Sequence, residues 1–501
     1  MKPNILFIQV DQLGAQFLGC YGDPVCHAPN LDRLASGGTV FETAYCNFPL
    51  CSPSRASMAT GKLCSEIGAY DNAAELPATI PTYAHYLRAS GYQTALSGKM
   101  HFIGPDQHHG FERRLTPDLY PADFSWVPNW GDEGERDTND PRSVTIAGVC
   151  ERSMQIDFDD LVTFHAVQHL YDMARSEDDR PFFLQVSYTH PHEPYLCQKA
   201  FWDLYEDADI PLPEVPALPE DQHDAHSARL LSDFGMLNVR FADDDILTAR
   251  RAYYGSISYL DQKIGQLVDT LDRIGKRENT VIVFTSDHGE MLGERGMWFK
   301  KHFYEPSLRV PLIIAGGAFT AGRAMTPASL VDLLPTFMGV AEGAGWTSSI
   351  EPLDGEDLAT KLTDEPDRPV YAEYLAEATT APIFMVRQGR FKYVHSAADP
   401  PLLFDVTGDP CERENLAGRP AHAEVEARLR ALVLQRWDSD LLSERIRLSQ
   451  KRRRLVLDSD LQGARPRWNH DEDPGAQVVW YRGETSYNEW AFKYLPIVGD
   501  S

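Results

Sequence analysis

A cysteine stands at the start of an unusual run of small and polar residues, CSPSRASMATG, which extends from Cys51 to Gly61. Pro53 restricts the residue before it to extended backbone and is tolerated in the first turn of a helix, so a helix is expected to begin beside Cys51. The free N–H groups of a helix N-terminus attract an anion, and Arg55 follows one turn later. A lone cysteine is more often a buried structural residue. Its register with Pro53 and Arg55 instead favours an anion-handling site.

Acidic and amide side chains directly follow two apolar segments that are far apart in the sequence. Asp11 and Gln12 follow the first segment, and Asp287 and His288 follow the second. Ligands of open α/β sheets bind outside the C-terminal ends of the strands. An oxygen-rich set suits Ca²⁺, Mg²⁺ or Mn²⁺ better than a structural zinc. We therefore expect these four residues to hold one divalent cation, although His288 could instead be a hydrogen-bonding neighbour of the ligands.

Candidate acids and bases follow further apolar segments in the same way. Lys99 and His101 follow one strand-like segment, His192 follows another, and Lys300 lies shortly after Asp287. A single lysine or histidine at such a place is more often a solvated surface group. Because five segments share this placement, we expect them to converge on one edge of a sheet.

The elements that must position these residues alternate between strands and helices in the first part of the chain. Strands are expected at 4–10, 93–97, 182–188, 280–286 and 310–315, and helices at 81–87, 159–175 and 244–274. This alternation predicts an α/β fold with a mostly parallel central sheet and helices on both faces.

The pattern changes after about residue 375. Short strands are expected at 383–387 and 390–394, joined by a turn at Gln388-Gly389, and a helix at 423–437. The predicted organisation is an α/β catalytic domain over 1–375, a smaller C-terminal α+β subdomain with an antiparallel sheet over 376–440, and a tail over 441–501.

Composition excludes several classes of protein. The 501 residues include 47 Lys and Arg against 74 Asp and Glu, a net charge of −27, which argues against a nucleic-acid binder. No apolar run approaches the roughly 18 residues of a membrane span. The eight cysteines are too sparse for a disulfide scaffold and contain no CxxC pair. We expect a cytoplasmic protein with reduced cysteines and with neither nucleic acid nor membrane as a partner.

Taken together, these motifs resemble those of the type I sulfatases of the alkaline phosphatase superfamily. The C-x-P-S-R run followed by T-G matches the sulfatase signature, and the resemblance extends from Lys2 to at least Tyr393. Within this group the sequence is most similar to the choline sulfatases, in segments outside the signature. Those segments are 70–75, 80–88, 96–107, 120–124 and 201–207. The resemblance implies the alkaline-phosphatase-like sandwich fold.

The resemblance also implies a mechanism. Cys51 would be oxidised to formylglycine by a formylglycine-generating enzyme, which is a transient partner. One hydroxyl of the formylglycine hydrate would attack sulfur and form a sulfated hemiacetal. His101 would remove the proton of the second hydroxyl, and sulfate would leave by elimination. Lys99 and Arg55 would hold the formylglycine and the metal-bound anion in place.

The resemblance assigns the remaining residues to the substrate, a small-molecule sulfate ester. His192 and Lys300 would bind sulfate oxygens and stabilise the leaving alkoxide. Asn72 would contact a sulfate or substrate oxygen, and the cation, with Ca²⁺ favoured, would polarise the ester oxygens. Trp126 and Glu377 match the positions with which choline sulfatases bind a quaternary ammonium. The favoured activity is therefore the hydrolysis of choline-O-sulfate.

Two departures from the family keep alternatives open. Many sulfatases have a second Asp after the first, whereas this chain has Gln12 at that position, as choline sulfatases and phosphonate monoester hydrolases do. Residues 137–140 lack the aromatic and histidine-bearing run of the choline sulfatases. The alternatives are a phosphonate monoester or phosphodiester hydrolase, or an arylsulfatase, on the same scaffold. A more distant one is a non-catalytic, anion-binding homologue.

The last sixty residues are unusually aromatic for a chain terminus. Terminal tails are usually frayed and polar unless something holds them, and aromatic residues are enriched in interface cores. We therefore expect a homo-oligomer, a dimer or tetramer, built partly from residues after about 440; the alternative is a tail that packs on its own subunit. The aromatic residues are Trp468, Trp480, Tyr481, Tyr487, Trp490, Phe492 and Tyr494.

Overall fold

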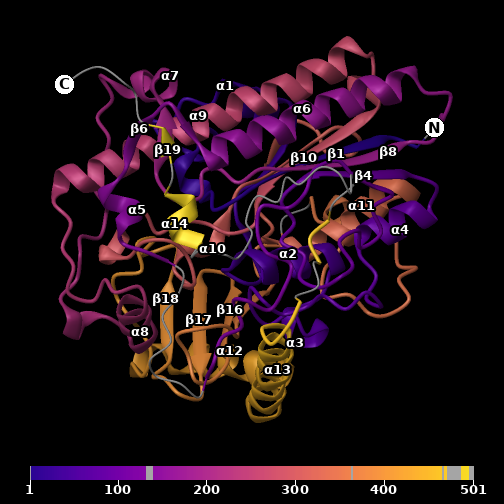
Figure 1. The fold of residues 1–501 in the computed structure, drawn as a ribbon. Coiled ribbons are helices and arrows are strands. Elements are labelled where there is room, and N and C mark those ends of the chain that lie inside the picture. The colour runs from indigo at the N-terminus through magenta and orange to yellow at the C-terminus, as the bar shows by residue number, and fades with distance from the viewer. Residues whose placement is uncertain are drawn as a thin grey trace.

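The computed structural model describes residues 2–130, 139–362, 365–464, 468–470, 487–492 and 494–495. Its centre is an eight-stranded sheet with the order β13-β2-β12-β10-β1-β8-β4-β5 (Figure 1). The strands are β1 (Asn4–Val10), β2 (Thr39–Phe41), β4 (Gln93–Gly98), β5 (Arg113–Arg114), β8 (Phe182–Ser187), β10 (Thr280–Ser286), β12 (Leu312–Ala315) and β13 (Gly322–Ala324). The neighbours β4, β8, β1 and β10 run parallel, whereas β12 is antiparallel to β10 and β2. The expected mostly parallel sheet is confirmed.

Helices cover both faces of this sheet. Successive side chains along a buried strand point to opposite faces, so each strand contributes to two separate hydrophobic cores. Ile5 and Phe7 pack in a core with helices α2, α4 and α11, whereas Leu6 and Ile8 pack on the opposite face with α1, α6 and α9. Figure 1 shows α6 and α9 above the sheet and α4 and α11 below it. The helices are α1 (Pro29–Gly37), α2 (Cys51–Thr60), α4 (Tyr83–Ala89), α6 (Met154–Arg175), α9 (Asp243–Arg273) and α11 (Leu333–Glu342).

The strand expected at 310–315 is interrupted at Pro311. Residues on either side of the proline join different sheets, because β12 enters the large sheet while β11 (Arg309–Val310) pairs with β3 (Ala44–Tyr45). A proline has no N–H to donate to a strand ladder, which accounts for the break. The remaining short elements are β14 (Ala328–Ser329), β6 (Gly148–Cys150), β9 (Leu196–Gln198), α3 (Cys64–Ile67), α5 (Arg142–Thr145), α7 (Lys199–Trp202), α8 (Ala225–Asp233) and α10 (Glu305–Leu308).

A four-stranded antiparallel sheet follows, in the order β15-β16-β17-β18. Its strands are β15 (Val370–Tyr374), β16 (Ile383–Gln388), β17 (Phe391–Ser396) and β18 (Leu402–Asp405), and α12 (Ala423–Arg436) packs on it. The expected hairpin is present, but its turn was placed one residue too early. Gln388 pairs with Phe391, so Gly389 and Arg390 form the turn, and Gly389 adopts a φ of +59° that suits glycine. The domain boundaries at 375 and 440 stay a prediction, and β15 shows that this sheet begins before residue 375.

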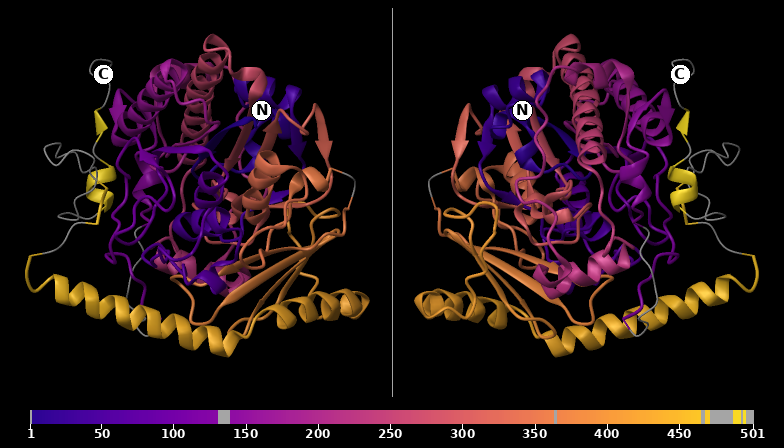
Figure 2. Two further views of the ribbon diagram at one scale, coloured as in Figure 1. Left: turned by 90° about the vertical axis from the view of Figure 1, so that its right-hand side faces the viewer. Right: turned by 90° about the vertical axis from the view of Figure 1, so that its left-hand side faces the viewer.

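A long helix that the sequence pattern did not reveal, α13 (Ser439–Asp460), follows α12. Figure 2 shows α12 and α13 running beneath the body of the protein. Asp438 caps α13 by accepting a hydrogen bond from the N–H of Leu441 at 3.0 Å, and Leu442 and Ile446 are buried in the main core. Among the described residues, no helix is both long and apolar enough to cross a membrane.

Some of the aromatic tail residues contact their own chain. Trp468 lies edge-on against Phe124 at 5.0 Å, and Phe492 packs under the guanidinium of Arg142 at 4.8 Å. Tyr494 lies in β19 (Tyr494–Leu495), which pairs with β7 (Arg152–Ser153). Tyr487 and Trp490 belong to α14 (Tyr487–Ala491), whereas Trp480 and Tyr481 lie outside the described residues.

Candidate active site

Residue 51 opens the helix that carries the signature motif. The expected helix start is confirmed, because Cys51 is the first residue of α2 and the backbone of Leu50 before it is extended. Every residue of α2 is buried. The side-chain carbonyl of Asn72 accepts a hydrogen bond from the N–H of Ser52 at 3.0 Å. The lining of a cavity at this helix start consists of Leu50, Cys51, Asn72, His101, Tyr120, Trp126, Asn139, His192, Glu193, Lys300 and Lys301.

Arg55 organises the carboxylates at the edge of the sheet. Its guanidinium donates to Oδ2 of Asp287 at 2.8 Å and to Oδ2 of Asp11 at 3.0 Å. It also donates to the carbonyl of Lys99 and to Oγ of Ser187, both at 2.8 Å. Arg55 is therefore fully engaged below the cavity and orients the two carboxylates. Arg55 does not belong to the lining of the cavity that contains Cys51.

Four buried side chains form a group that could hold a metal ion: Asp11, Cys51, Asp287 and His288, whose ligand atoms lie within 4.8 Å of one another. Nε2 of His288 is 3.1 Å from Sγ of Cys51, 3.7 Å from Oδ1 of Asp11 and 3.8 Å from Oδ1 of Asp287. Because Arg55 binds the Oδ2 atoms, both Oδ1 atoms turn toward the group. Two carboxylate oxygens and an imidazole nitrogen fit a hard divalent cation.

Gln12 was expected to be a metal ligand, but its side chain forms hydrogen bonds with two glutamates and a lysine. Its amide nitrogen donates to Oε2 of Glu193 at 2.6 Å and to Glu290, and its carbonyl accepts from Nζ of Lys300 at 2.5 Å. Burial and the charge of Glu193 raise the pKa of Glu290 to about 7. Gln12 as a metal ligand stays a prediction. The sequence reasoning missed both glutamates, although each stands within two residues of a predicted site residue.

Lys99 and His101 share an aromatic support that the sequence reasoning also missed. Lys99 forms a short ion pair with Asp11, and its ammonium lies 4.1 Å from the ring centre of Tyr120. His101 stacks on the same ring at 4.7 Å and meets Trp126 edge-on at 5.7 Å. Burial lowers the pKa of His101 below its ordinary value, so the imidazole is neutral and can accept a proton.

The electrostatics of the cavity favour anions at residue 51. Burial raises the pKa of the Cys51 thiol, but the charges of Lys99 and Lys300 outweigh it and bring the pKa well below its ordinary value. Burial likewise raises the pKa of Asp11, and Lys99 and Arg55 help to lower it to about 2. A site with this excess of positive potential suits an anionic substrate group.

His192 and Lys300 form a hydrogen-bonded pair on the other side of the cavity. Nδ1 of His192 lies 2.8 Å from the carbonyl of Glu193, so Nδ1 carries the hydrogen and Nε2 is left as an acceptor. Lys300 donates to that Nε2 at 2.7 Å. The structure thus places these two predicted residues together, facing the cavity that contains Cys51.

Of the three residues expected to bind the substrate, two line the cavity and one does not. Trp126 and Asn72 line the cavity. Glu377 instead forms an ion pair with Lys301, whose Nζ lies 2.6 Å from its Oε1. Of the segment 137–140, residues 137 and 138 lie outside the described residues, and Asn139 donates to Oε1 of Glu193 at 2.8 Å.

Comparison with known proteins agrees with this arrangement. A family model described as Sulfatase matches residues 3–344, and one described as N-sulphoglucosamine sulphohydrolase, C-terminal matches residues 293–438. The chain belongs to the sulfatase family. This sulfatase is 46% identical to the choline-sulfatase of Rhizobium meliloti (strain 1021), over 94% of this chain and 93% of that protein. It is 28% identical to the arylsulfatase of Clostridium perfringens (strain 13 / Type A), over 87% of this chain and 94% of that protein.

The fold also matches a solved relative. The structure of the phosphonate monoester hydrolase of Agrobacterium radiobacter aligns with a TM-score of 0.70 and 24% identity, over 87% of this chain and 95% of that chain. This similarity shows the fold alone. It confirms the expected alkaline-phosphatase-like fold. The family match and the choline-sulfatase relative, not this structural similarity, show that the chain is a sulfuric ester hydrolase.

Proposed function

We propose that this sulfatase hydrolyses sulfate monoesters to an alcohol and inorganic sulfate, with choline-O-sulfate as the favoured substrate. The observation that carries the proposal is the position of Cys51, which lines the same cavity as His101, His192 and Lys300. Asp11, Asp287 and His288 form a possible metal-binding group together with the same Cys51. Cys51 therefore lies next to all the groups that the reaction needs: a base, cationic side chains that bind an anion, and ligands suited to a metal ion.

Cys51 is converted to formylglycine in this proposal, and the hydrate of the aldehyde is the nucleophile. The conversion requires a formylglycine-generating enzyme as a transient partner. The register of Pro53 and Arg55 with Cys51 supports it, as does the basic surrounding that lowers the thiol pKa. Lys99 would orient the nucleophile from its place between Asp11 and Tyr120. After transfer of the sulfuryl group, the neutral His101 would accept the proton of the second hydroxyl of the hydrate, so that sulfate leaves by elimination and the aldehyde forms again.

His192 and Lys300 act on the leaving group in this proposal. Breaking the sulfate ester places negative charge on the alcohol oxygen, which the ammonium of Lys300, oriented by His192, would stabilise. The ammonium of Lys300 is held between Gln12 and His192, so it is oriented before the substrate arrives. Asn72 contributes its side-chain amide nitrogen to a sulfate oxygen, because Ser52 already occupies its carbonyl.

Asp11, Asp287 and His288 would hold one divalent cation, with Ca²⁺ favoured and Gln12 completing the set. Such a cation supplies Lewis-acid polarisation of the sulfate oxygens. Arg55 holds the two carboxylates in the orientation that this requires.

The preference for choline-O-sulfate rests on two observations. The choline-sulfatase of Rhizobium meliloti is 46% identical to this chain. Trp126 gives the cavity an aromatic face, and such faces attract quaternary ammonium groups.

Sulfate release from a panel of esters tests the proposal. The enzyme should release sulfate from choline sulfate and more slowly from an aryl sulfate, and should be far slower on an aryl phosphonate. Cys51→Ala should lose all turnover, whereas the remote Cys411→Ala should retain it. Intact mass of the active enzyme should show formylglycine at residue 51. A preference for the phosphonate would favour the phosphonate hydrolase, and no turnover with formylglycine present would favour a non-catalytic homologue.

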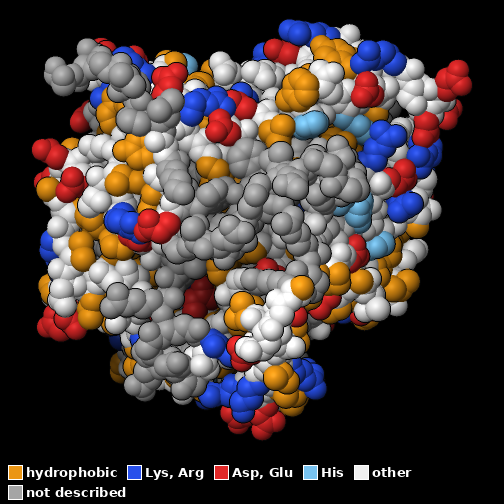
Figure 3. Space-filling model, in the orientation of Figure 1, with side chains coloured by type: hydrophobic (Ala, Val, Ile, Leu, Met, Phe, Trp, Pro, Cys, Tyr) orange, Lys and Arg blue, Asp and Glu red, His pale blue; other side chains and the backbone are white. Residues whose placement is uncertain are grey.

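We further propose a homo-oligomer in which α13 takes part. Leu441, Leu448 and Leu455 are spaced by seven residues and are exposed to 45%, 48% and 71%. Such a spacing places them along one side of the helix. Basic side chains gather at the same end of the molecule (Figure 3). An apolar stripe of this kind is typical of a surface that another chain covers.

A further inference from the structure

Lys301 directly follows Lys300 in the sequence but forms an ion pair with a different residue, Glu377. Its Nζ lies 2.6 Å from Oε1 of Glu377. The Lys301 residue is only 1% exposed and lines the cavity together with Cys51 and Trp126. The Glu377 side chain is 21% exposed. A buried lysine that lines the cavity therefore engages the carboxylate that the family resemblance assigns to a cationic leaving group.

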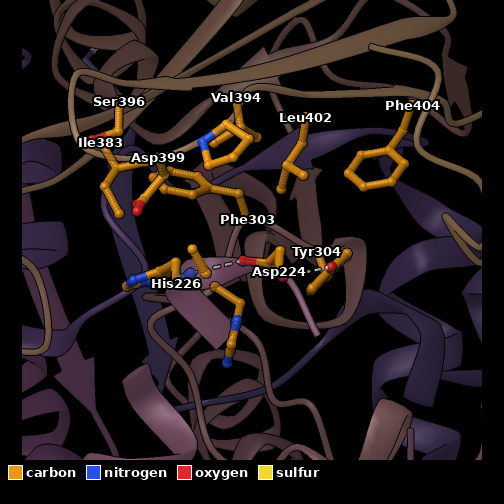
Figure 4. Close-up of a pocket in the computed structure, with 13 residues that line it drawn as sticks. Asp224, His226, Phe303, Tyr304, Ile383, Val394, Ser396, Asp399, Leu402 and Phe404 are labelled. Atoms are coloured by element: carbon orange, nitrogen blue, oxygen red, sulfur yellow. Dashed lines mark hydrogen bonds between the residues drawn. The ribbon is translucent and has the colours of Figure 1, made fainter. Parts of the chain in front are cut away.

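The backbone holds Lys301 in this place from both sides. Its N–H donates to the carbonyl of Pro49 at 3.0 Å, and its carbonyl lies 2.8 Å from Nε2 of His226, which must carry the hydrogen. His226 belongs to a second cavity, between the start of α8 and the small sheet. Figure 4 shows His226, Asp224 and Tyr304 on one side of that cavity and Val394, Leu402 and Phe404 on the other. The backbone φ of Lys301 is +79°, a value that residues other than glycine rarely adopt.

Charge explains why the lysine and the glutamate stay together. Burial lowers the pKa of Lys301, and Glu377 opposes this by favouring the ammonium. Removing Lys301 would take this counter-charge from the mostly buried carboxylate of Glu377, which would be costly. In the free enzyme, Glu377 is therefore engaged by an internal cation.

We propose that Lys301 is a specificity-determining residue that competes with a cationic leaving group for Glu377. The proposal rests on the sulfatase function proposed above. A quaternary ammonium has no N–H and cannot replace the hydrogen bond that Lys301 donates, so it must share or displace that ion pair. Lys301 thereby weakens the preference for cationic esters and makes neutral sulfate esters better competitors.

The test compares choline sulfate with its neutral isostere, in which a quaternary carbon replaces the nitrogen. The measured quantity is the ratio of kcat/KM for the two esters. Lys301→Met should raise this ratio about tenfold, mainly through a lower KM for choline sulfate, because Glu377 then faces the substrate alone. In a Glu377→Gln background, the same Lys301 change should leave the ratio unaltered. Lys301→Arg, which keeps the positive charge, should keep the wild-type ratio.

Controls separate the outcomes. Lys199→Met removes an exposed lysine paired with Asp203 and should not change the ratio. If Lys301→Met does not fold, Lys301→Gln removes the charge but can still donate to Glu377, and should raise the ratio as well. An unchanged or lowered ratio in folded, active variants would overturn the inference. Wild-type enzyme that hydrolyses no sulfate ester would instead contradict the proposed function.

Discussion

Arg453 and Asp71 form a two-pronged ion pair across 382 positions of sequence, with N–O distances of 2.6 and 2.7 Å. Arg453 lies on α13, whereas Asp71 precedes Asn72 in the cavity wall. Asp71 is completely buried and Arg453 is 5% exposed. Helix α13 therefore holds in place the loop whose Asn72 accepts a hydrogen bond from the first turn of α2.

Removing one partner of this pair should destabilise the protein strongly. Arg453→Met leaves the buried carboxylate of Asp71 without its counterion, and we expect the free energy of unfolding to fall by about 3–5 kcal/mol. Urea denaturation measures the change. The exposed neighbour Arg452→Met serves as the matched control and should change stability by less than about 0.5 kcal/mol. Equal effects of the two substitutions would show that the pair is not stabilising.

Glu373 should make the protein less stable as the pH rises. Its carboxylate accepts from the N–H of Ser65 at 2.7 Å and from Nε1 of Trp437 at 3.0 Å, and burial raises its pKa from 4.5 to about 7. The folded state thus binds the proton more tightly than the unfolded state. The resulting stabilisation is complete below about pH 4.5 and is lost as the pH rises through about 7.

Glu373→Gln should flatten this dependence. We expect the decline in unfolding free energy across that pH range to be smaller in the variant by at most about 3 kcal/mol, since one pKa unit corresponds to 1.36 kcal/mol. Denaturant unfolding at several pH values measures it. Some decline should remain, because burial also raises the pKa of Glu290 and Glu412 to about 7. Identical pH profiles for wild type and variant would contradict the prediction.

Removal of the divalent cation should abolish turnover and lower the melting temperature. Carboxylate oxygens of Asp11 and Asp287 lie within 4.8 Å of each other, so their charges repel more strongly once the proposed ion is removed. Metal analysis should find one ion per chain in the wild type and less in Asp287→Asn. The exposed Asp178→Asn should bind metal as the wild type does. Two tightly bound zinc ions per chain would refute the proposed site.

His192→Ala should slow the hydrolysis of esters with poor leaving groups most. An alkyl alcohol needs stabilisation of its developing charge, and we expect kcat for choline sulfate to fall about 10²-fold or more. An aryl sulfate with an acidic phenol should lose much less. Steady-state kinetics on both esters measure the difference, with His422→Ala as the control. An equal loss on both substrates would mean that His192 does not act on the leaving group.

Charges on the exposed stripe of α13 should weaken subunit association. Leu448→Glu together with Leu455→Glu should convert the oligomer to smaller species in sedimentation experiments, because burying a carboxylate in an apolar interface is costly. Leu434 on α12 is similarly exposed, at 49%, so Leu434→Glu is the matched control. A wild-type protein that sediments as a monomer would contradict the proposed assembly.

Local pattern was sufficient for the layout of the central sheet and for which side chains meet at one of its edges. The buried strands β1 and β10 are short apolar runs, and the residues that follow them, Asp11 and Asp287, meet because parallel neighbours end at the same edge. The start of α2 at Cys51 was equally predictable, since Pro53 favours the first turn of a helix. These inferences depend on residues that are close in sequence or on a repeating alternation.

The partners of several side chains were decided only by the tertiary structure. The amide of Gln12 is held by Glu193, Glu290 and Lys300, and Lys301 engages Glu377. The three partners of Gln12 lie 181, 278 and 288 positions away from it, and nothing in local propensity or periodicity specifies which acid meets which base. α13 was missed for a related reason: its buried face is narrow, and its place is set by long-range contacts such as Arg453 with Asp71. The sequence by itself therefore determined which groups reach the edge of the sheet, and only the packed chain decided how they are paired.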